Sequence, residues 1–367
     1  MRISAPRLLH LGVIGLLPIL LTACAAPTAA PTPQPATSSQ SVTLAPSPSP
    51  TDTPQPQFTP NPTQPPAPPH LTYPPTDIIL DIAYSPTGDT LAVAAGLTVY
   101  LYDAATLNEQ ARIPFTAWVN RMAFHPTQPI LATAAKDGRI QFWDSRAGAE
   151  LCTFTAHPKG AIAVAFHPTL PLIGTTGNAI TSKVWDISAV LAGGCDVTER
   201  GQLIGASYNA TDFLFSPDGR FLALTDIETI RLRNSPDLTL IATLRTELPI
   251  YDLALSPDGR FLAAANRFSM VTLFDIHDPQ KPIRSNLGEH TPKTFTWRVA
   301  FSPDGRWLAA GNNRGDLTVW DMTTRQPAGG FHLPNDVAAL AFDPHGRWLL
   351  AGGTDAQIHF LDLETLP

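Results

Sequence analysis

The stretch FSPDGRWLAAGNNRGDLTVWD (residues 301–321) contains the pattern that decides the fold. An apolar segment leads into a Ser-Pro-Asp-Gly turn, a second segment rich in small residues leaves it, and the stretch ends on Trp-Asp. Pro presets φ for a turn, Asp bonds to nearby main chain, and Gly tolerates positive φ. The stretch therefore reads as short β-strands joined by tight turns.

This pattern occurs seven times along the chain. The turn prolines lie 40 to 49 residues apart and are Pro86, Pro126, Pro168, Pro217, Pro257, Pro303 and Pro344. In six repeats an aromatic or apolar residue is followed by an Asp, and this Asp lies 17 or 18 residues after the turn proline. In the fourth repeat Arg233-Asn234 replaces the pair. A period of this length indicates repeated units of one architecture.

Each repeat is too small to bury both faces of its own sheet. In the second repeat, VNRMAF, PILATAA, RIQFWD and ELCTFTA read as four strands separated by turn residues. Such antiparallel units pack side by side into a ring, and small residues in the second strands suit the narrow space near its axis. The sequence therefore predicts an all-β fold, a seven-bladed β-propeller with four-stranded antiparallel blades over residues 70–367.

The seventh repeat reads as a three-stranded blade that needs a fourth strand. LDLETLP follows its third strand, and the segment HLTYPP (70–75) precedes the first repeat. We expect this segment to supply the missing outer strand, because closure removes free sheet edges and an edge strand tolerates Pro. The alternative is that residues 70–75 only end the preceding linker and leave the seventh blade with three strands.

The N-terminus has the features of a secretory signal. Basic residues in MRISAPR precede a short apolar segment, and residues 1–23 are expected to form a signal peptide. Leu21-Thr22-Ala23-Cys24 resembles the lipobox of bacterial lipoproteins, a resemblance that implies lipidation of Cys24 and a location outside the cytoplasm on a bacterial membrane. The alternative is an ordinary cleaved signal with an incidental Cys.

Residues 24–69 form a segment of different composition. Fifteen of the 45 residues from 25 to 69 are Pro, and most others are Thr, Ser, Gln and Ala. A segment with so few apolar residues is predicted to be a disordered linker, extended by its prolines. The alternative is a Pro-rich ligand for a partner domain.

The charge of the propeller region indicates which partners it can bind, and its cysteines bear on the redox state of its compartment. Residues 70–367 carry 22 basic and 30 acidic residues, a balance that argues against nucleic acid as a partner. Cys152 and Cys195 could form a disulfide in an oxidising compartment, or could remain two free thiols.

The repeats resemble WD repeats, and residues 70–367 resemble a seven-bladed WD-repeat (WD40) propeller. The second repeat is the most similar, with Asp137 six residues before Trp143. The resemblance implies a hydrogen-bonded tetrad of Asp, His, Ser or Thr, and Trp in each blade. No repeat carries the whole set: the third has His157, but Asn178 stands where Asp is expected. These departures point toward the looser superfamily with TolB-like and quinoprotein-like (YVTN) rings.

The resemblance also implies a binding face, formed by the loops that lead into the first strands and the turns between second and third strands. Aromatic residues and Arg dominate many interfaces. The candidate partner-binding residues on this face are Trp118, Asn120, Tyr208, Tyr251, Arg267, Phe268, Trp297 and Arg314. The alternative is that aromatics such as Tyr251 and Trp297 fill the axial channel or pack between blades. Two long linkers, 187–205 and 276–296, are either functional loops or tolerated insertions.

The sequence shows no catalytic or metal-binding motif such as G-x-S-x-G, H-E-x-x-H or C-x-x-C. We therefore expect no catalytic residue, no metal and no cofactor, and a membrane-anchored scaffold that binds an unidentified protein. The alternatives are a small-ligand-binding or enzymatic propeller that uses the axial channel, and a purely structural envelope component.

Overall fold

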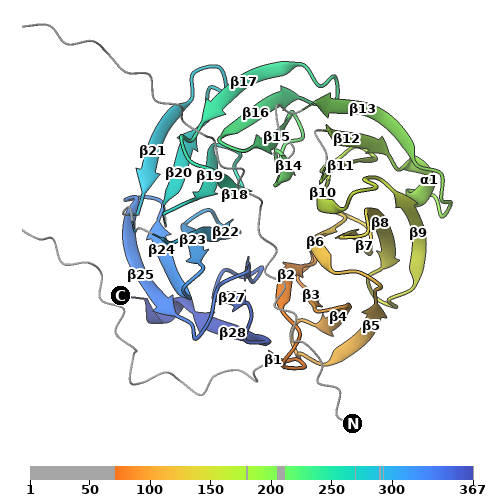
Figure 1. Ribbon diagram of the computed structural model, residues 1–367, viewed down its shortest axis with the longest axis horizontal. Helices are drawn as coiled ribbons and strands as arrows, with labels where there is room; N and C mark the ends of the chain where they lie inside the picture. Colours follow the sequence, from red (N-terminus) through yellow and green to blue (C-terminus); the bar gives the residue numbers. More distant parts are fainter. Residues whose placement is uncertain are drawn as a thin grey trace, which may run out of the picture. The chain divides into compact units, whose positions relative to one another are not determined.

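The computed structural model describes residues 71–178, 181–204, 211–268, 270–288, 291 and 293–366. The predicted signal peptide, Cys24, the linker 24–69 and Tyr208 lie outside the described residues. Within the described part of the chain, seven antiparallel sheets of four strands each surround a central axis, as Figure 1 shows. The predicted all-β, seven-bladed propeller is confirmed.

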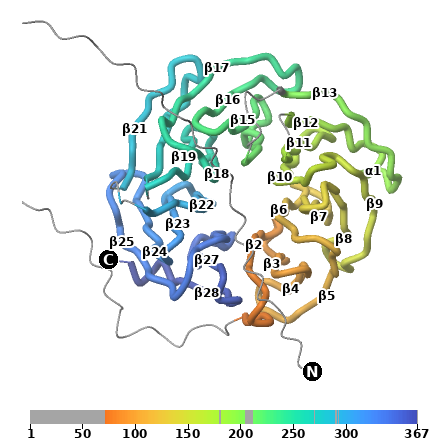
Figure 2. The backbone as a smooth tube through the Cα atoms, viewed as in Figure 1, coloured from red at the N-terminus to blue at the C-terminus, as the bar shows by residue number. Residues whose placement is uncertain are grey.

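In blades 1 to 6 the four strands follow one another along the chain from the axis to the rim, and Figure 2 traces this path. Blade 1 contains β2 (Ile79–Tyr84), β3 (Thr90–Ala95), β4 (Thr98–Asp103) and β5 (Glu109–Pro114). Blade 2 contains β6 (Val119–Phe124), β7 (Ile130–Ala135), β8 (Arg139–Asp144) and β9 (Glu150–Thr155). Blade 3 contains β10 (Ala161–Phe166), β11 (Leu172–Gly177), β12 (Thr181–Asp186), the short helix α1 (Ser188–Leu191) and β13 (Thr198–Ile204).

The remaining blades repeat this order. Blade 4 contains β14 (Phe213–Phe215), β15 (Phe221–Asp226), β16 (Thr229–Asn234) and β17 (Leu240–Arg245). Blade 5 contains β18 (Ile250–Leu255), β19 (Phe261–Asn266), β20 (Val271–Asp275) and β21 (Ile283–Leu287). Blade 6 contains β22 (Thr296–Phe301), β23 (Trp307–Asn312), β24 (Asp316–Asp321) and β25 (Gln326–His332). Blade 7 contains β26 (Ala339–Phe342), β27 (Trp348–Gly352), β28 (Gln357–Asp362) and β1 (Leu71–Thr72), and a 3₁₀ turn, η1 (Leu363–Thr365), follows β28.

The N-terminal strand closes the ring. Leu71 and Thr72 of β1 pair antiparallel with Ile358 and Gln357 of β28, and the Tyr73 N–H donates to the Ala356 carbonyl over 2.9 Å. Residues from the start of the propeller therefore complete the blade formed by its last strands, as predicted. The innermost strands also form an unbroken circuit, since each contacts the next and β26 contacts β2.

The turn quoted at the outset is held by its own side chains. Ser302 Oγ donates to Asp304 Oδ1 over 2.5 Å and accepts from the Trp307 N–H at 2.9 Å, while Gly305 has a φ of 72°. These bonds satisfy the turn main chain locally and explain why Ser, Asp and Gly recur at these positions.

The core lies mainly at the faces between blades. All six residues of β3, β7, β11 and β15 are buried; small side chains are frequent in β3, β7 and β11, whereas β15 carries Phe221, Leu222 and Leu224. The aromatic residues before Asp are buried too: Trp143 and Trp185 are each 7% exposed and Trp320 is 3% exposed. Trp143 of blade 2 packs in one cluster with Ala92 and Leu101 of blade 1, as expected for a residue between blades.

Blade 3 retains more of the WD-repeat polar network than the sequence suggested. Thr175 Oγ1 lies 2.8 Å from His157 Nε2 and accepts from Trp185 Nε1 at 2.9 Å. The network lacks only its acidic member, because Asn178 Nδ2 donates to the Lys159 carbonyl instead. Three tetrad members are thus present in this blade, and apolar packing does not stabilise it alone.

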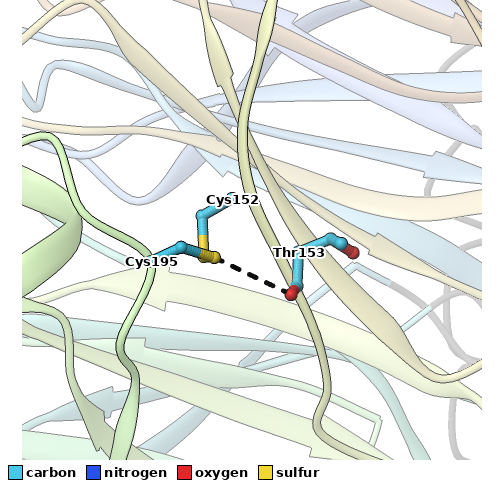
Figure 3. The surroundings of a disulfide bond; sticks show 3 residues. All are labelled: Cys152, Thr153 and Cys195. Atoms are coloured by element: carbon cyan, nitrogen blue, oxygen red, sulfur yellow. Dashed lines mark hydrogen bonds between the residues drawn. A yellow bond between two sulfur atoms is a disulfide. The ribbon is translucent and has the colours of Figure 1, made fainter.

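A disulfide joins Cys152 of β9 to Cys195, which lies between α1 and β13, with the two Cα atoms 5.1 Å apart (Figure 3). Cys195 Sγ also lies 4.0 Å from the Thr153 carbonyl oxygen. The longer linker of blade 3 is therefore attached covalently to the outer strand of blade 2.

Candidate functional site

We call the upper face the one formed by the loops that lead into the first strands and by the turns between second and third strands. Trp118, directly before β6, is 40% exposed there, and Lys136 Nζ lies 5.1 Å from the centre of its ring. Its carbonyl accepts from the Lys136 N–H over 2.8 Å, which connects the loop before β6 to the turn after β7. Trp118 thus presents an aromatic surface beside a cation.

A second group on this face, the aromatic patch, consists of Tyr251, Arg267, Phe268, Phe295 and Trp297. The Tyr251 ring centre lies 5.9 Å from that of Phe295 and 5.7 Å from that of Trp297. The Arg267 guanidinium carbon lies 5.0 Å from the ring centre of Phe268 and 5.6 Å from that of Phe295. The structure brings together four of the predicted residues, and adds Phe295, which sequence reasoning missed.

The patch keeps a large apolar surface in contact with solvent. Trp297 is 40% exposed, while Tyr251 is half-buried, and burial raises the pKa of the Tyr251 hydroxyl against the opposing effect of Arg267. Partial burial holds the rings in place, and cation–π contacts orient the guanidinium over them. The arrangement offers aromatic and cationic groups to a ligand.

The end of the long linker 276–296 holds the patch in position. The Phe268 N–H donates to the Thr294 carbonyl over 2.7 Å, and the Thr291 N–H donates to the Phe268 carbonyl over 2.9 Å. These bonds stabilise Phe268 at a φ of 69°, a region that residues other than Gly rarely occupy. Arg267 and Phe295 also pair as an isolated β-bridge. The linker therefore attaches to blade 5 before it enters blade 6.

The other predicted residues differ in their roles. Asn120 Nδ2 donates to the Ala161 carbonyl over 2.7 Å, a bond between blades 2 and 3 that indicates a structural role. Arg314 is exposed in the turn between β23 and β24. Tyr208 lies outside the described residues.

One register position at the start of the innermost strands forms an axial ring that sequence reasoning did not identify. It is the third residue of β2, β6, β10, β18 and β22, the residue before β14 and the first residue of β26. Five of the seven positions are charged: Asp81, Arg121, Asp212, Asp252 and Arg298. Ala163 and Ala339 occupy the other two. The available signal was a charge at one fixed register position in otherwise apolar strands, as in ILDIAY, VNRMAF, IYDLAL and TWRVAF.

The acidic members connect neighbouring blades. Asp81 Oδ2 accepts from the Met122 N–H at 2.6 Å, Asp212 Oδ2 from the Leu253 N–H at 3.0 Å and Asp252 Oδ2 from the Val299 N–H at 2.9 Å. In each case the carboxylate of one blade binds the main chain of the next. All three residues are buried, so these bonds satisfy main-chain donors that water does not reach.

The two arginines extend across the axis between these acids. Arg121 forms a hydrogen-bonded ion pair with Asp252 of blade 5, and its terminal nitrogens lie 3.6 Å from Asp81 and 3.7 Å from Asp212. Arg298 Nη2 donates to the Leu80 carbonyl over 3.0 Å, and Nη1 lies 3.9 Å from Asp252. Burial raises the pKa of Asp81, an effect opposed by both arginines. Burial, with a contribution from Arg121, lowers the pKa of Arg298 to about 9, so this guanidinium stays protonated at neutral pH.

A cavity of about 430 Å³ lies along the axis beside this ring. It extends from the charged ring toward the lower face, which we define by the turns between first and second strands; the turn prolines Pro86, Pro126, Pro168 and Pro217 line it there. The aromatic patch does not contribute to its wall. The predicted upper-face residues and the axial cavity are therefore two separate features.

The described residues contain no group of three or more His, Cys, Asp or Glu side chains arranged to hold a metal ion. They also contain no helix long and apolar enough to cross a membrane.

Three segments match the WD40 family, described as "WD domain, G-beta repeat": residues 110–144, 280–321 and 330–362. They fall on blades 1–2, 5–6 and 6–7, so matches occur on both sides of the ring. A search of curated proteins gave no match. Fold and repeats together define a seven-bladed β-propeller. The chain is a seven-bladed β-propeller that contains WD40 repeats in these segments, and such a fold suggests a protein-interaction scaffold.

Proposed function

We propose that this WD40 propeller is a lipid-anchored, extracytoplasmic scaffold that binds a protein partner through its upper face. The observation that carries the proposal is the aromatic patch, where Trp297 remains 40% exposed beside Tyr251 and Phe295. Trp, Tyr and Arg are the side chains most often responsible for binding energy at interfaces. A long linker that holds the patch through main-chain bonds gives it a fixed shape before any partner arrives.

Two features support the location. The Leu21-Thr22-Ala23-Cys24 stretch follows a signal-like segment, and lipidation of Cys24 would anchor the chain. The Cys152–Cys195 disulfide agrees with an oxidising compartment outside the cytoplasm.

β1 enters the propeller beside the turn between β27 and β28. Leu71 pairs with Ile358, Thr72 with Gln357, and Tyr73 reaches Ala356 in the turn that belongs to the upper face. The chain therefore runs toward the upper face along β1.

The partner interaction is tested by cross-linking on intact membranes, followed by reconstitution with the purified partner. We expect the double variant Arg267→Ala/Trp297→Ala to weaken binding at least tenfold. Leu170→Ala is the matched control, because Leu170 is 39% exposed but lies in a turn on the lower face. Equal partner binding by the double variant and the native protein would reject the upper face as the binding surface.

The anchor is tested separately with Cys24→Ser. We expect this variant to lose incorporation of labelled palmitate and to leave the membrane fraction. Retention of the label, or of membrane attachment, would contradict the proposed lipidation site without affecting the partner assay.

A further inference from the structure

The axial ring holds more hydrogen-bond donors than its own acceptors can satisfy. The carboxylate oxygens of the acids already accept hydrogen bonds. Asp212 Oδ1 accepts from the Phe213 N–H at 2.9 Å, and Asp212 Oδ2 accepts from the Leu253 N–H at 3.0 Å. Asp252 accepts from Arg121 with one oxygen and from the Val299 N–H with the other. The acidic members thus contribute mainly to the junctions between blades.

The arginines retain donor capacity. A guanidinium carries five N–H groups, yet the Nε of Arg298 has no hydrogen-bond partner within the described part of the chain. The distances of 3.6, 3.7 and 3.9 Å from the arginines to Asp81, Asp212 and Asp252 exceed hydrogen-bond length. Both side chains line the cavity and are 16% exposed. The Nε of Arg298 is buried, so an incoming acceptor would meet the terminal N–H groups of Arg121 and Arg298, which lie beyond hydrogen-bond length from Asp81, Asp212 and Asp252 in these contacts.

Apart from Ser216, the side chains of the rest of the cavity wall are apolar. Phe124, Phe166, Leu214 and Phe215 line it between the charged ring and the turn prolines of the lower face. A volume of about 430 Å³ falls within the range of small-molecule sites. A ligand that fits these surfaces has a polar acceptor at one end and an apolar body.

We propose that the axial cavity binds a small amphipathic carboxylate, with its carboxylate on the guanidinium groups of Arg121 and Arg298 and its apolar body against Phe166 and Phe215. Guanidinium and carboxylate groups match in geometry and form paired, charge-assisted hydrogen bonds. Burial raises the pKa of Asp81, and both arginines oppose this effect. This site goes beyond the proposed scaffold function, because it lies apart from the aromatic patch.

The axial ring also contains three acids, which would favour a cationic ligand, so the test compares ligands of different charge. The test is calorimetric titration of the purified full-length protein with 4-phenylbutyrate, 4-phenylbutanol and 4-phenylbutylamine, which share one apolar body. We expect the carboxylate to bind at least tenfold more tightly than the alcohol, and the amine to bind weakest. Tighter binding of the amine, or no binding of the carboxylate at millimolar concentration, would overturn the proposal.

A variant locates the carboxylate. We expect Arg298→Met to weaken 4-phenylbutyrate at least tenfold while the affinity for 4-phenylbutanol stays within twofold. Arg112→Met, which replaces an exposed arginine of the outer strand β5, is the matched control and should leave both affinities unchanged. An unchanged carboxylate affinity in Arg298→Met would contradict the assignment.

A measurement on the native protein keeps the test independent of how the variant folds. Hydrogen exchange with and without 4-phenylbutyrate should show protection in β6, β10, β14 and β22, whose residues line the cavity. Protection from exchange that is confined to the blade rims or to the upper-face loops would place the ligand elsewhere and contradict the proposal. Neither outcome bears on the aromatic patch, so the two functions are tested separately.

Discussion

At the residue scale, one hydroxyl in blade 3 serves two ring nitrogens. Thr175 Oγ1 accepts from the Trp185 indole and contacts His157 Nε2, and Thr175 itself is fully buried. In blade 2, Thr133 Oγ1 accepts from Trp143 Nε1 at 3.2 Å. The two threonines therefore form a natural comparison.

We expect Thr175→Val to destabilise the protein more than Thr133→Val does. Valine keeps the shape but leaves both His157 and Trp185 without a partner, at about 1–3 kcal/mol for each buried group. Thr133→Val removes one long bond and should cost about 1 kcal/mol. Urea unfolding of the two variants measures the difference, and equal losses would show that the histidine contact contributes nothing.

Stability should also depend on pH through His157. Burial lowers the pKa of this histidine to about 4, below its ordinary value of 6.5. The unfolded chain then binds more protons than the folded one between these values, so stability falls as pH drops from 6.5 toward 4. The loss reaches about 3 kcal/mol near pH 4. Urea titrations of the native protein and of His157→Gln measure it, and parallel pH profiles would refute this origin.

The residues of the upper face show how far single positions could be predicted. Tyr251, Arg267, Phe268 and Trp297 were identified because repeat numbering places them in equivalent loops. Phe295 was missed, since its position depends on how residues 291–295 bond to Phe268. The charged axial ring was missed for a related reason: its significance depends on strand register, which brings residues from five blades to one axis.

At the element scale, the two long linkers have different structural consequences. The linker 276–296 attaches to Phe268 through main-chain bonds and organises the aromatic patch. The linker 187–205 contains α1 and is joined to β9 by the disulfide. Sequence length revealed both linkers, but only the folded chain shows which neighbour each contacts.

We expect loss of the disulfide to destabilise the junction of blades 2 and 3. The cysteines are 43 residues apart, and closing such a loop contributes at most about 4 kcal/mol in the chain-entropy model. The double variant Cys152→Ala/Cys195→Ser and the native protein with dithiothreitol should lose similar stability in thermal unfolding. A melting temperature that is unaffected in both cases would mean that the linker is held by packing alone.

At the scale of the whole molecule, both the pairing of β1 with β28 and the charged network at the axis connect blades of the propeller. The seven-fold repeat made the propeller predictable, because each repeat carries its own turn signals. Closure was predictable from the missing strand of the seventh repeat. The charge network was not, since Arg121 and Asp252 lie 131 residues apart in sequence.

Deletion of residues 71–75 should open the ring. The deletion removes the pairing of β1 with β28 and the contact of Tyr73 with Tyr100, whose ring centres lie 4.9 Å apart. We expect a lower unfolding temperature and self-association through the exposed edge of β28. Deletion of residues 65–69 is the control of equal length. Identical melting and identical sedimentation of the two deletions would contradict a role for β1 in closure.

We expect replacement of Arg121 to lower the free energy of unfolding far more than replacement of a surface arginine does. Arg121→Met leaves three buried carboxylates with less compensation, and loss of one partner from a buried pair costs about 3–5 kcal/mol. Arg139→Met breaks a pair in which Arg139 is 39% exposed and should cost about 0–1 kcal/mol. Denaturant midpoints compare the two, and a loss for Arg121→Met as small as the control would show that the axial pairs are not coupled to stability.

Arg121 of blade 2 pairs with Asp252 of blade 5 across the axis, at the inner end of the axial cavity. The cavity extends toward the lower face and shares no lining residue with the aromatic patch of the upper face. A ligand in the cavity and a partner on the upper face should therefore bind independently while Arg121 keeps its position. A partner that saturates the upper face should leave the dissociation constant of a small molecule in the cavity unchanged, and any coupling between the two would require Arg121 to move.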